Sequence, residues 1–193
     1  MKPYLVGIAG PSASGKSTVS RMLTERYPSA ARINLDDFFF SKDTFPLHNS
    51  WSNWELPQNL DFSKLHSALS DLLEGRTVTV PDYSKKEGKA VGEKIVRPKD
   101  LIIAEGFYLF HDRKIRDLFN LKIFLDLPED IQMKRRLGRQ PDLDPRYFTE
   151  VIAPFFKKHG LPARKHADCI INASRDIDKV AEDIMSLLKE RLS

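Results

Sequence analysis

The sequence predicts an α/β fold, a doubly wound sandwich in which helices cover both faces of a five-stranded parallel sheet. Short apolar runs alternate with helical patterns along the chain, as in repeated strand–helix–strand units. The run at 101–106 is apolar without alternation, which is typical of a parallel strand covered on both faces. The chain has 193 residues and shows no linker or internal repeat, so we expect residues 1–193 to form a single domain.

The first expected strand, 4–9, leads into a glycine-rich loop, and an expected helix follows at 18–27. The loop fits the pattern G-x-x-x-x-G-K-[ST], in which backbone N–H groups and the start of a helix surround phosphate oxygens. Lys16 adds a full charge, and the Ser17 hydroxyl is placed to ligate Mg²⁺. The alternative is a Gly/Ser turn with a chance lysine. We predict binding of ATP, or another nucleoside triphosphate, with Mg²⁺ by Gly10, Pro11, Ser12, Ala13, Ser14, Gly15, Lys16, Ser17 and Thr18.

A second expected strand, 31–35, ends at two carboxylates. In open parallel sheets the ligand crevice lies outside the carboxyl ends of the strands. Asp36 is therefore expected to accept a proton from an attacking hydroxyl, with a turn-capping role as the alternative, which is favoured for Asp37. Residues 41–59 are predicted to be a functional loop without regular structure. Within it, Trp54 either stacks on a flat substrate ring or packs into the core, and core packing is preferred for Trp51.

The middle of the chain predicts a helix at 61–74 and a hairpin excursion at 76–98. The hairpin is expected to turn at 81–83, with its lysines (Lys85, Lys86 and Lys89) at a solvated tip. The strand that follows ends at Glu105, which we expect to hold Mg²⁺ together with Ser17. The alternative for Glu105 is an ordinary acid at a strand end. A further strand is expected at 121–126, with a structural role for Asp126.

The helix expected at 129–139 carries three arginines, and with the Pro-Asp segment after it we predict an Arg-rich lid at 134–147. Arg135 and Arg139 are four residues apart and share a helix face, whereas Arg136 points about 100° away. These arginines are expected to neutralise a transferring phosphoryl group, the alternative being an exposed helix face. A helix at 147–158, a strand at 167–172 and a helix at 176–191 complete the chain.

The composition favours a cytoplasmic protein that binds small molecules. The net charge of +4, from 31 basic and 27 acidic residues, is too balanced for a polybasic protein that binds nucleic acid or a membrane. No apolar run approaches the roughly 20 residues of a membrane span, and we expect no targeting segment because the first apolar run leads directly into the loop. The single cysteine, Cys169, excludes an internal disulfide and indicates a reducing compartment.

Several motifs occur together in an order and spacing that resemble the uridine kinase and nicotinamide riboside kinase superfamily of P-loop kinases. The match covers most of the chain, to about Asn172, and is more similar to the nicotinamide riboside branch. The motifs are the phosphate loop, Leu35-Asp36-Asp37-Phe38-Phe39, Trp54-Glu55, Ile103-Ala104-Glu105-Gly106-Phe107 and Lys134-Arg135-Arg136-Leu137-Gly138-Arg139.

The resemblance implies phosphoryl transfer from ATP to the 5′-hydroxyl of a small-molecule ribonucleoside, foremost nicotinamide riboside, as in NAD biosynthesis. It implies that Asp36 is the base, assisted by Lys16, and that Ser17 and Glu105 serve Mg²⁺. Phe39 and Trp54 would sandwich the base, and Glu55 would bind the ribose hydroxyls. Arg136 would contact the sugar and phosphate, while Arg135 and Arg139 would supply charge to the ATP phosphates from the lid.

Two departures from the family pattern bear on the substrate. The ribose-binding acid of the family is usually Asp, whereas this chain has Glu55. Uridine kinases carry a Tyr and then a His that reads the pyrimidine, whereas Tyr83 is followed here by Lys and Gly. The alternatives are a uridine or cytidine kinase, a kinase of another small metabolite alcohol, and, from a different class, a nucleotide-dependent switch or ATPase.

Overall fold

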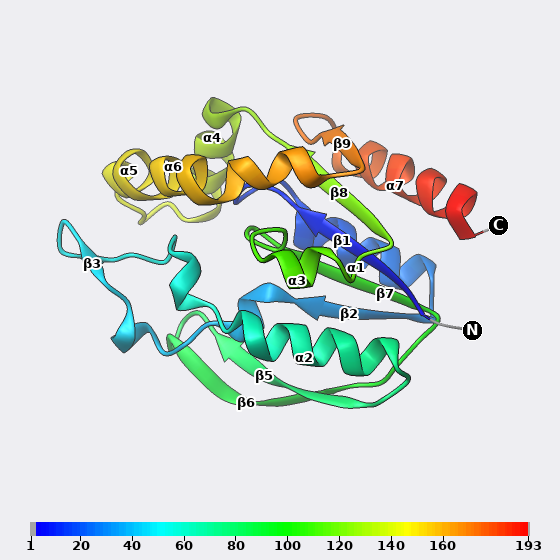
Figure 1. Cartoon of the computed structure of the whole chain (residues 1–193). Coiled ribbons are helices and arrows are strands. Elements are labelled where there is room, and N and C mark those ends of the chain that lie inside the picture. The colour runs from blue at the N-terminus through cyan, green and yellow to red at the C-terminus, as the bar shows by residue number, and fades with distance from the viewer. Residues whose placement is uncertain (1–2, 193) are drawn as a thin grey trace.

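The computed structural model, which describes residues 3–192, has a five-stranded parallel sheet at its centre, as the sequence predicts (Figure 1). The strand order is β2-β7-β1-β8-β9, so the strand before the phosphate loop lies in the middle. Ile8 of β1 pairs with Glu105 of β7, which brings the loop and that carboxylate to one edge of the sheet. The strands are β1 (Tyr4–Ala9), β2 (Ala30–Asn34), β7 (Leu101–Gly106), β8 (Leu121–Asp126) and β9 (Cys169–Asn172).

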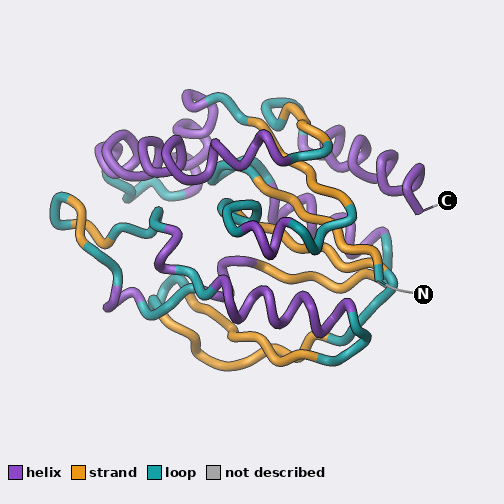
Figure 2. The backbone as a smooth tube through the Cα atoms, viewed as in Figure 1, coloured by secondary structure: helices purple, strands orange, loops and turns teal. Residues whose placement is uncertain are grey.

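Helices cover both faces of this sheet, which confirms the doubly wound sandwich (Figure 2). On one face, α1 (Lys16–Arg26) and α7 (Ile177–Leu192) pack against apolar side chains of β1, β7 and β8. On the other face lie α2 (Phe62–Leu73) and α3 (Arg113–Arg116). The start and end of α2 follow from local chemistry. Its N-cap residue Asp61 accepts a hydrogen bond from the backbone N–H of Lys64, and Gly75 just beyond it has a φ of 79°.

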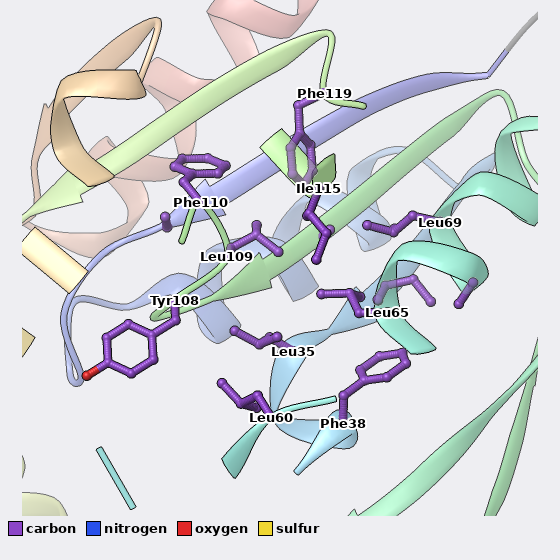
Figure 3. Close-up of a cluster of buried hydrophobic side chains, with 14 of the residues drawn as sticks. Leu35, Phe38, Leu60, Leu65, Leu69, Tyr108, Leu109, Phe110, Ile115 and Phe119 are labelled. Carbon is purple, nitrogen blue, oxygen red and sulfur yellow. The ribbon is translucent and has the colours of Figure 1, made fainter. Parts of the chain in front are cut away.

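The core beneath α2 is formed by fully buried aliphatic and aromatic side chains (Figure 3). Leu65 and Leu69 of α2 lie in the same cluster as Leu35 and Phe38, which come directly after β2. This packing fixes the segment that carries Asp36 against the sheet. The position of the expected base is therefore determined by core packing on both sides of it in the sequence.

Replacing Leu69 with Ala should lower the free energy of unfolding by about 2–5 kcal/mol, because the side chain is fully buried and leaves a cavity. Chemical denaturation of the variant and of Ser67→Ala, an exposed position on the same helix, measures the difference. A loss below 1 kcal/mol for Leu69→Ala would contradict the core described above.

Helical structure also covers the carboxyl ends of the strands. α4 (Glu129–Arg139) confirms the predicted helix. The helix expected at 147–158 is longer and less regular: α5 (Pro145–Tyr147) and α6 (Ala153–Phe155) alternate with π-helical turns at 148–152 and 156–160, and a 3-10 helix continues to His166. Pro154 and Pro162 lack the backbone N–H that a regular helix needs, which accounts for these interruptions.

The loop at 41–59 has more regular structure than predicted. It contains a two-stranded hairpin, β3 (Leu47–His48) and β4 (Trp51–Ser52), joined by Asn49 and Ser50, which have φ values of 47° and 70°. Positive φ at both central residues is the signature of a tight hairpin turn, which Asn tolerates. Short 3-10 turns occur on either side, at Lys42–Thr44 and Pro57–Asn59.

The excursion is a hairpin, but its turn lies later than predicted. β5 (Val78–Ser84) pairs with β6 (Lys89–Val96), so Pro81 and Asp82 are inside the first strand instead of at the turn. The chain reverses at 85–88, where Gly88 has a φ of 67° and donates its backbone N–H to the carbonyl of Ser84. Proline is tolerated in β5 because a two-stranded sheet leaves edges free of ladder hydrogen bonds. None of the helices within residues 3–192 is long and apolar enough to cross a membrane.

Candidate active site

The phosphate loop between β1 and α1 has the backbone of an anion-binding nest. Gly10, Ala13 and Gly15 all have positive φ, at 148°, 64° and 91°. A Cβ added at Gly10 would lie 2.4 Å from the carbonyl oxygen of Leu125, so only glycine fits there. The buried Ser14 hydroxyl has no hydrogen-bond partner among the described residues. The loop therefore offers polar groups that a bound phosphate would satisfy.

Lys16, at the start of α1, is buried, and its Nζ lies 2.7 Å from the carbonyl oxygen of Pro11. Burial lowers the pKa of its ammonium group to about 8, although the carboxylates of Glu105 and Asp36 act in the opposite direction. The side chain is thus a desolvated cation held within the loop. A buried cation of this kind is stabilised strongly when an anion binds beside it, because little water screens the attraction.

A cavity of about 710 Å³ opens in front of the loop and brings together most of the residues predicted from the sequence. It also contains side chains from the hairpin tip and from the helical segment after α4. Of the predicted residues, it is lined by Ser12, Ala13, Gly15, Lys16, Ser17, Thr18, Asp36, Phe39, Trp54, Glu55, Glu105, Arg136 and Arg139. Gly10, Pro11 and Ser14 belong to the loop behind this wall, and Arg135 does not line the cavity.

Asp36 lies on a short 3-10 helix (Leu35–Phe38) that begins where β2 ends. The side chain of Asn34 accepts a hydrogen bond from the backbone N–H of Asp36 at 3.0 Å, which fixes the turn. The carboxylate Oδ2 lies 2.5 Å from Nζ of Lys85. The sequence therefore placed Asp36 correctly at the cavity. Lys85 is exposed in the hairpin turn, as expected, but its ion pair with Asp36 was not expected. The turn at 85–88 directs this lysine back over the site.

The neighbouring Asp37 is buried and forms an ion pair with Lys94 of β6 at 2.8 Å. Lys94 also lies 2.8 Å from Asp82 of β5. This three-residue network joins the hairpin to the turn that carries Asp36. The expected turn-capping role of Asp37 is thus replaced by a role in holding the hairpin.

Glu105 is only 2% exposed and lines the cavity at the end of β7. Its Oε1 accepts a hydrogen bond from the Arg32 guanidinium at 2.8 Å. Arg32 lies on β2 and points toward the same face of the sheet, because β2 and β7 are paired in register. The ion pair holds the orientation of the Glu105 carboxylate at the sheet edge.

The arginines of α4 are arranged differently from the expectation. Arg135 donates to the carbonyl oxygens of Ala173 and Ser174, at 2.8 and 3.2 Å, so its guanidinium is held at the loop after β9. Arg136 and Arg139, three residues apart, both line the cavity. The sequence argument paired Arg135 with Arg139, but residues at i and i+3 share a helix face as well. Because Arg135 is held by the loop after β9, it is Arg136 that lies beside Arg139 in the cavity.

Arg136 and Arg139 stand close enough for their charges to interact. The Nη1 of Arg136 lies 3.4 Å from the Ser12 hydroxyl of the phosphate loop, while its buried Nε has no hydrogen-bond partner among the described residues. Burial and the neighbouring charge of Arg136 lower the pKa of Arg139. Two crowded, partly desolvated cations beside the loop favour the binding of an anion.

Glu55 is a buried carboxyl group on the cavity wall. Burial raises its pKa to about 7, with the positive charge of Arg136 opposing that shift. Its segment is held from both sides: the backbone N–H of Glu55 donates to the Asn53 side chain, and its carbonyl accepts from the Tyr108 hydroxyl at 2.8 Å. A buried carboxyl group of this kind needs polar partners, which hydroxyl groups of a ligand would supply.

The aromatic residues form a cluster and not a sandwich. The rings of Phe39 and Trp54 are in edge-to-face contact, with centroids 5.4 Å apart and an interplanar angle of 83°. A base held between two rings needs them parallel and separated by its own thickness, so the expected arrangement is wrong for this structure. Phe45, Tyr83 and Phe107 also pack around Phe39. Phe39 is buried in this cluster, whereas Trp54 is partly exposed to the cavity.

Sequence reasoning missed several residues of the site. Lys85 and Lys94 were missed because the hairpin turn was placed at the Pro-Asp pair; the glycine at 88 was the better turn signal. Arg32 had a signal in the alternation of β2, where an arginine occurs between buried residues. Tyr147, which lines the cavity and donates its hydroxyl to the carbonyl of Ser52 at 3.1 Å, had none.

A parallel sheet of this order, with a phosphate loop after its central strand and an arginine-bearing helix above it, defines the P-loop kinase fold. Solved structures agree with this class. Phosphoribulokinase from Rhodobacter spheroides superimposes with a TM-score of 0.60 and 16% identity, over 90% of this chain and 73% of that one. Shikimate kinase from Bacteroides thetaiotaomicron does so with a TM-score of 0.58 and 15% identity, over 96% of this chain and 98% of that one.

Residues 5–176 match the model of the Phosphoribulokinase / Uridine kinase family, and the chain belongs to this family. "Uridine kinase" of Streptococcus uberis is 31% identical over 207 residues, which cover 98% of this chain and 97% of that protein. "Uridine kinase-like protein 3" of Arabidopsis thaliana is 33% identical over 196 residues, 95% of this chain. The chain spans about two fifths of the length of the Arabidopsis relative, since the match covers 42% of it. These relatives confirm the superfamily expected from the motifs.

Proposed function

We propose that this chain is a kinase that transfers the γ-phosphoryl group of ATP to the 5′-hydroxyl of a pyrimidine ribonucleoside, uridine or cytidine. The observation that carries the proposal is that one cavity contains the phosphate loop, Asp36 and Glu55. A phosphate loop alone requires only a nucleotide. A carboxylate facing it and a second, buried carboxyl group beside aromatic rings provide for an acceptor with hydroxyl groups and a flat base.

The donor half consists of the loop, Lys16, Arg136 and Arg139. The loop N–H groups and Lys16 would hold the ATP phosphates, and the crowded pair of arginines would neutralise the charge that develops on the transferring group. Ser17 and Glu105 fit Mg²⁺ because they offer oxygen ligands at the edge where the phosphates would lie. When bound, Mg²⁺ would screen phosphate charge. The Arg32 ion pair would keep the Glu105 carboxylate oriented toward the cavity.

In the acceptor half, Asp36 is the proposed base. The 5′-hydroxyl oxygen would form a bond to the γ-phosphorus while the bond between this phosphorus and the oxygen of the leaving ADP breaks. Oδ2 of Asp36 would accept the proton that the hydroxyl group loses. Glu55 would accept hydrogen bonds from the ribose hydroxyls. The ion pair of Asp36 with Lys85 has to break for the hydroxyl to reach this oxygen.

A pyrimidine acceptor is proposed ahead of nicotinamide riboside, which the sequence motifs had favoured. The relatives named above are called uridine kinase or uridine kinase-like protein, and nothing in them points to nicotinamide riboside. The edge-to-face contact of Phe39 with Trp54 also removes the parallel rings on which that expectation rested.

An ATP-consumption assay over a panel of nucleosides tests the proposal, with product identification by mass spectrometry. We expect uridine and cytidine to yield their 5′-monophosphates. If no nucleoside stimulates ADP formation, the proposal is wrong. ATP hydrolysis that is stimulated only by a macromolecule would instead support a nucleotide-dependent switch or ATPase.

Trp54→Ala should weaken nucleoside binding by about 1–3 kcal/mol, because the partly exposed indole lines the cavity where a base would stack. The Michaelis constant for the nucleoside measures the effect, and that for ATP serves as the internal control. Trp54→Phe should recover most of the loss because a flat ring is retained. An unchanged nucleoside constant in Trp54→Ala would assign the residue to packing alone.

ATP binding should take up protons above pH 8. Lys16 has a pKa of about 8 in the free protein, and a bound triphosphate would favour its charged form. Above pH 8, Lys16 must therefore gain a proton when ATP binds, and the affinity should fall by up to about tenfold per pH unit. Calorimetry at pH 8.5 in buffers of different ionisation enthalpy measures this uptake. The same uptake by Lys16→Met would show that another group is responsible.

A further inference from the structure

Lys85 is an exposed residue of the hairpin turn that also lines the acceptor end of the cavity. Its Nζ lies 2.5 Å from Oδ2 of Asp36 and 5.9 Å from the centroid of the Phe39 ring, over the ring face. Both neighbours belong to the proposed acceptor half. The ammonium group thus lies between the reacting hydroxyl's expected position and the aromatic cluster, where a nucleoside base would approach.

The hairpin holds Lys85 there through contacts on both strands. Lys94 of β6 forms ion pairs with Asp37 and with Asp82, and the Tyr83 hydroxyl donates to the carbonyl of Phe40 at 3.2 Å. At the tip, the backbone N–H of Lys42 donates to the carbonyl of Gly88 at 2.7 Å. The turn is therefore anchored to the loop that follows Asp36. The Lys85 side chain itself is 59% exposed, so it can shift without disturbing the fold.

We propose that Lys85 selects the acceptor by charge, favouring a neutral base with carbonyl oxygens and disfavouring a cationic base such as the pyridinium ring of nicotinamide riboside. The inference rests on the proposed nucleoside kinase function and deepens it. Once Asp36 turns to the substrate hydroxyl, the ammonium group loses its ion-pair partner. A carbonyl oxygen of the base accepts a hydrogen bond from it, whereas a cationic ring repels it.

Other charged residues of both signs line the cavity. Arg136, Arg139 and Lys42 also line the wall and add positive charge. Five carboxylates oppose them, those of Asp36, Glu55, Glu105, Asp142 and Asp144. Burial raises the pKa of Glu55 to about 7, which reduces its negative charge near neutral pH. Lys85 differs from the other cations in its position, because its Nζ lies over the Phe39 ring of the aromatic cluster, where a base would approach.

The preference for a neutral base over a cationic one can be tested with nicotinamide riboside and its reduced form. Reduction removes the positive charge of the ring and leaves the size of the ligand nearly unchanged. Both are measured as competitors of uridine phosphorylation, so that a slow substrate still gives an inhibition constant. In the parent protein the reduced form should bind about tenfold more tightly. Lys85→Met should bring the two inhibition constants to within about twofold, and Lys85→Arg should restore the difference.

Lys86→Met is the matched control, because Lys86 is the exposed neighbour in the same turn and does not line the cavity. It should behave as the parent protein. An equal preference for the two forms in the parent, an unchanged preference in Lys85→Met, or no competition by either form in Lys85→Met would overturn the inference while uridine phosphorylation stands. Failure of the parent to phosphorylate any nucleoside would overturn the proposed function as well.

Discussion

Asp36→Asn is expected to lower the turnover number by about 10³-fold while the affinity for ATP stays near that of the parent protein. The amide keeps the shape of the side chain but cannot accept the proton of the attacking hydroxyl, and general-base catalysis contributes about 10²- to 10⁴-fold. The loss should appear in the turnover number, since the interaction is made mainly in the transition state. Steady-state kinetics with uridine, and equilibrium binding of ATP, measure the two quantities.

Asp43→Asn provides the control for this substitution. Asp43 is an exposed carboxylate on the next 3-10 turn, outside the cavity, so its loss should change turnover by less than twofold. Retention of parental turnover by Asp36→Asn would remove Asp36 from the role of base. A loss of ATP affinity of the same size as the loss of turnover would indicate a damaged phosphate loop instead.

The parts of the fold that depend on local chemistry were predictable from the sequence. β1 and β7 are apolar runs buried on both faces, so their length and ending show in the pattern, as for the run that ends at Glu105. The phosphate loop is readable because two of its three positive-φ positions, Gly10 and Gly15, are occupied by glycine. Asp36 was placed at the cavity because carboxyl ends of parallel strands meet at one sheet edge.

The parts that depend on contacts between distant segments were not predictable. The Lys85–Asp36 contact joins residues 49 positions apart and arises from where the hairpin turns, a choice between two turn signals in one segment. Arg135 lies outside the cavity because its guanidinium group donates hydrogen bonds to two carbonyl oxygens after β9. No pattern within the sequence of α4 indicates this contact. The contact of Phe39 with Trp54 likewise reflects the packing of several rings.

Two of these contacts, that of Lys85 with Asp36 and that of Phe39 with Trp54, lie in the acceptor half of the cavity. The proposed donor half is built on the loop and α1, whose geometry is local, together with two arginines of α4. The proposed acceptor half is assembled from the hairpin, the 41–59 loop and the segment after α4. Because families of kinases share the donor chemistry and differ in the acceptor, the sequence alone predicted the reaction class better than the substrate. The residues proposed to contact the base come from segments far apart in the sequence, so no local pattern indicates them.

Lys16→Met should abolish most phosphoryl transfer and, at the same time, stabilise the ligand-free protein. Removing the cation that is proposed to hold the ATP phosphates is expected to lower the turnover number by about 10³-fold. The pKa of Lys16 falls from its ordinary 10.5 to about 8 on folding, so below pH 8 its charge opposes folding by roughly 3 kcal/mol. Met has a similar length without charge, and it should recover about 1–3 kcal/mol of this at pH 7.

The pH dependence distinguishes this effect from a general change in packing. Between pH 8 and 10.5 the unfolded chain keeps a proton on Lys16 that the folded protein has lost, so the contribution of Lys16 to stability rises with pH in this window. The stability advantage of Lys16→Met should therefore be full below pH 8 and vanish above pH 10.5. Denaturation of both proteins at pH 7, 9 and 10.5 measures it. An advantage that does not change with pH would mean that Lys16 is not a desolvated cation in the folded state.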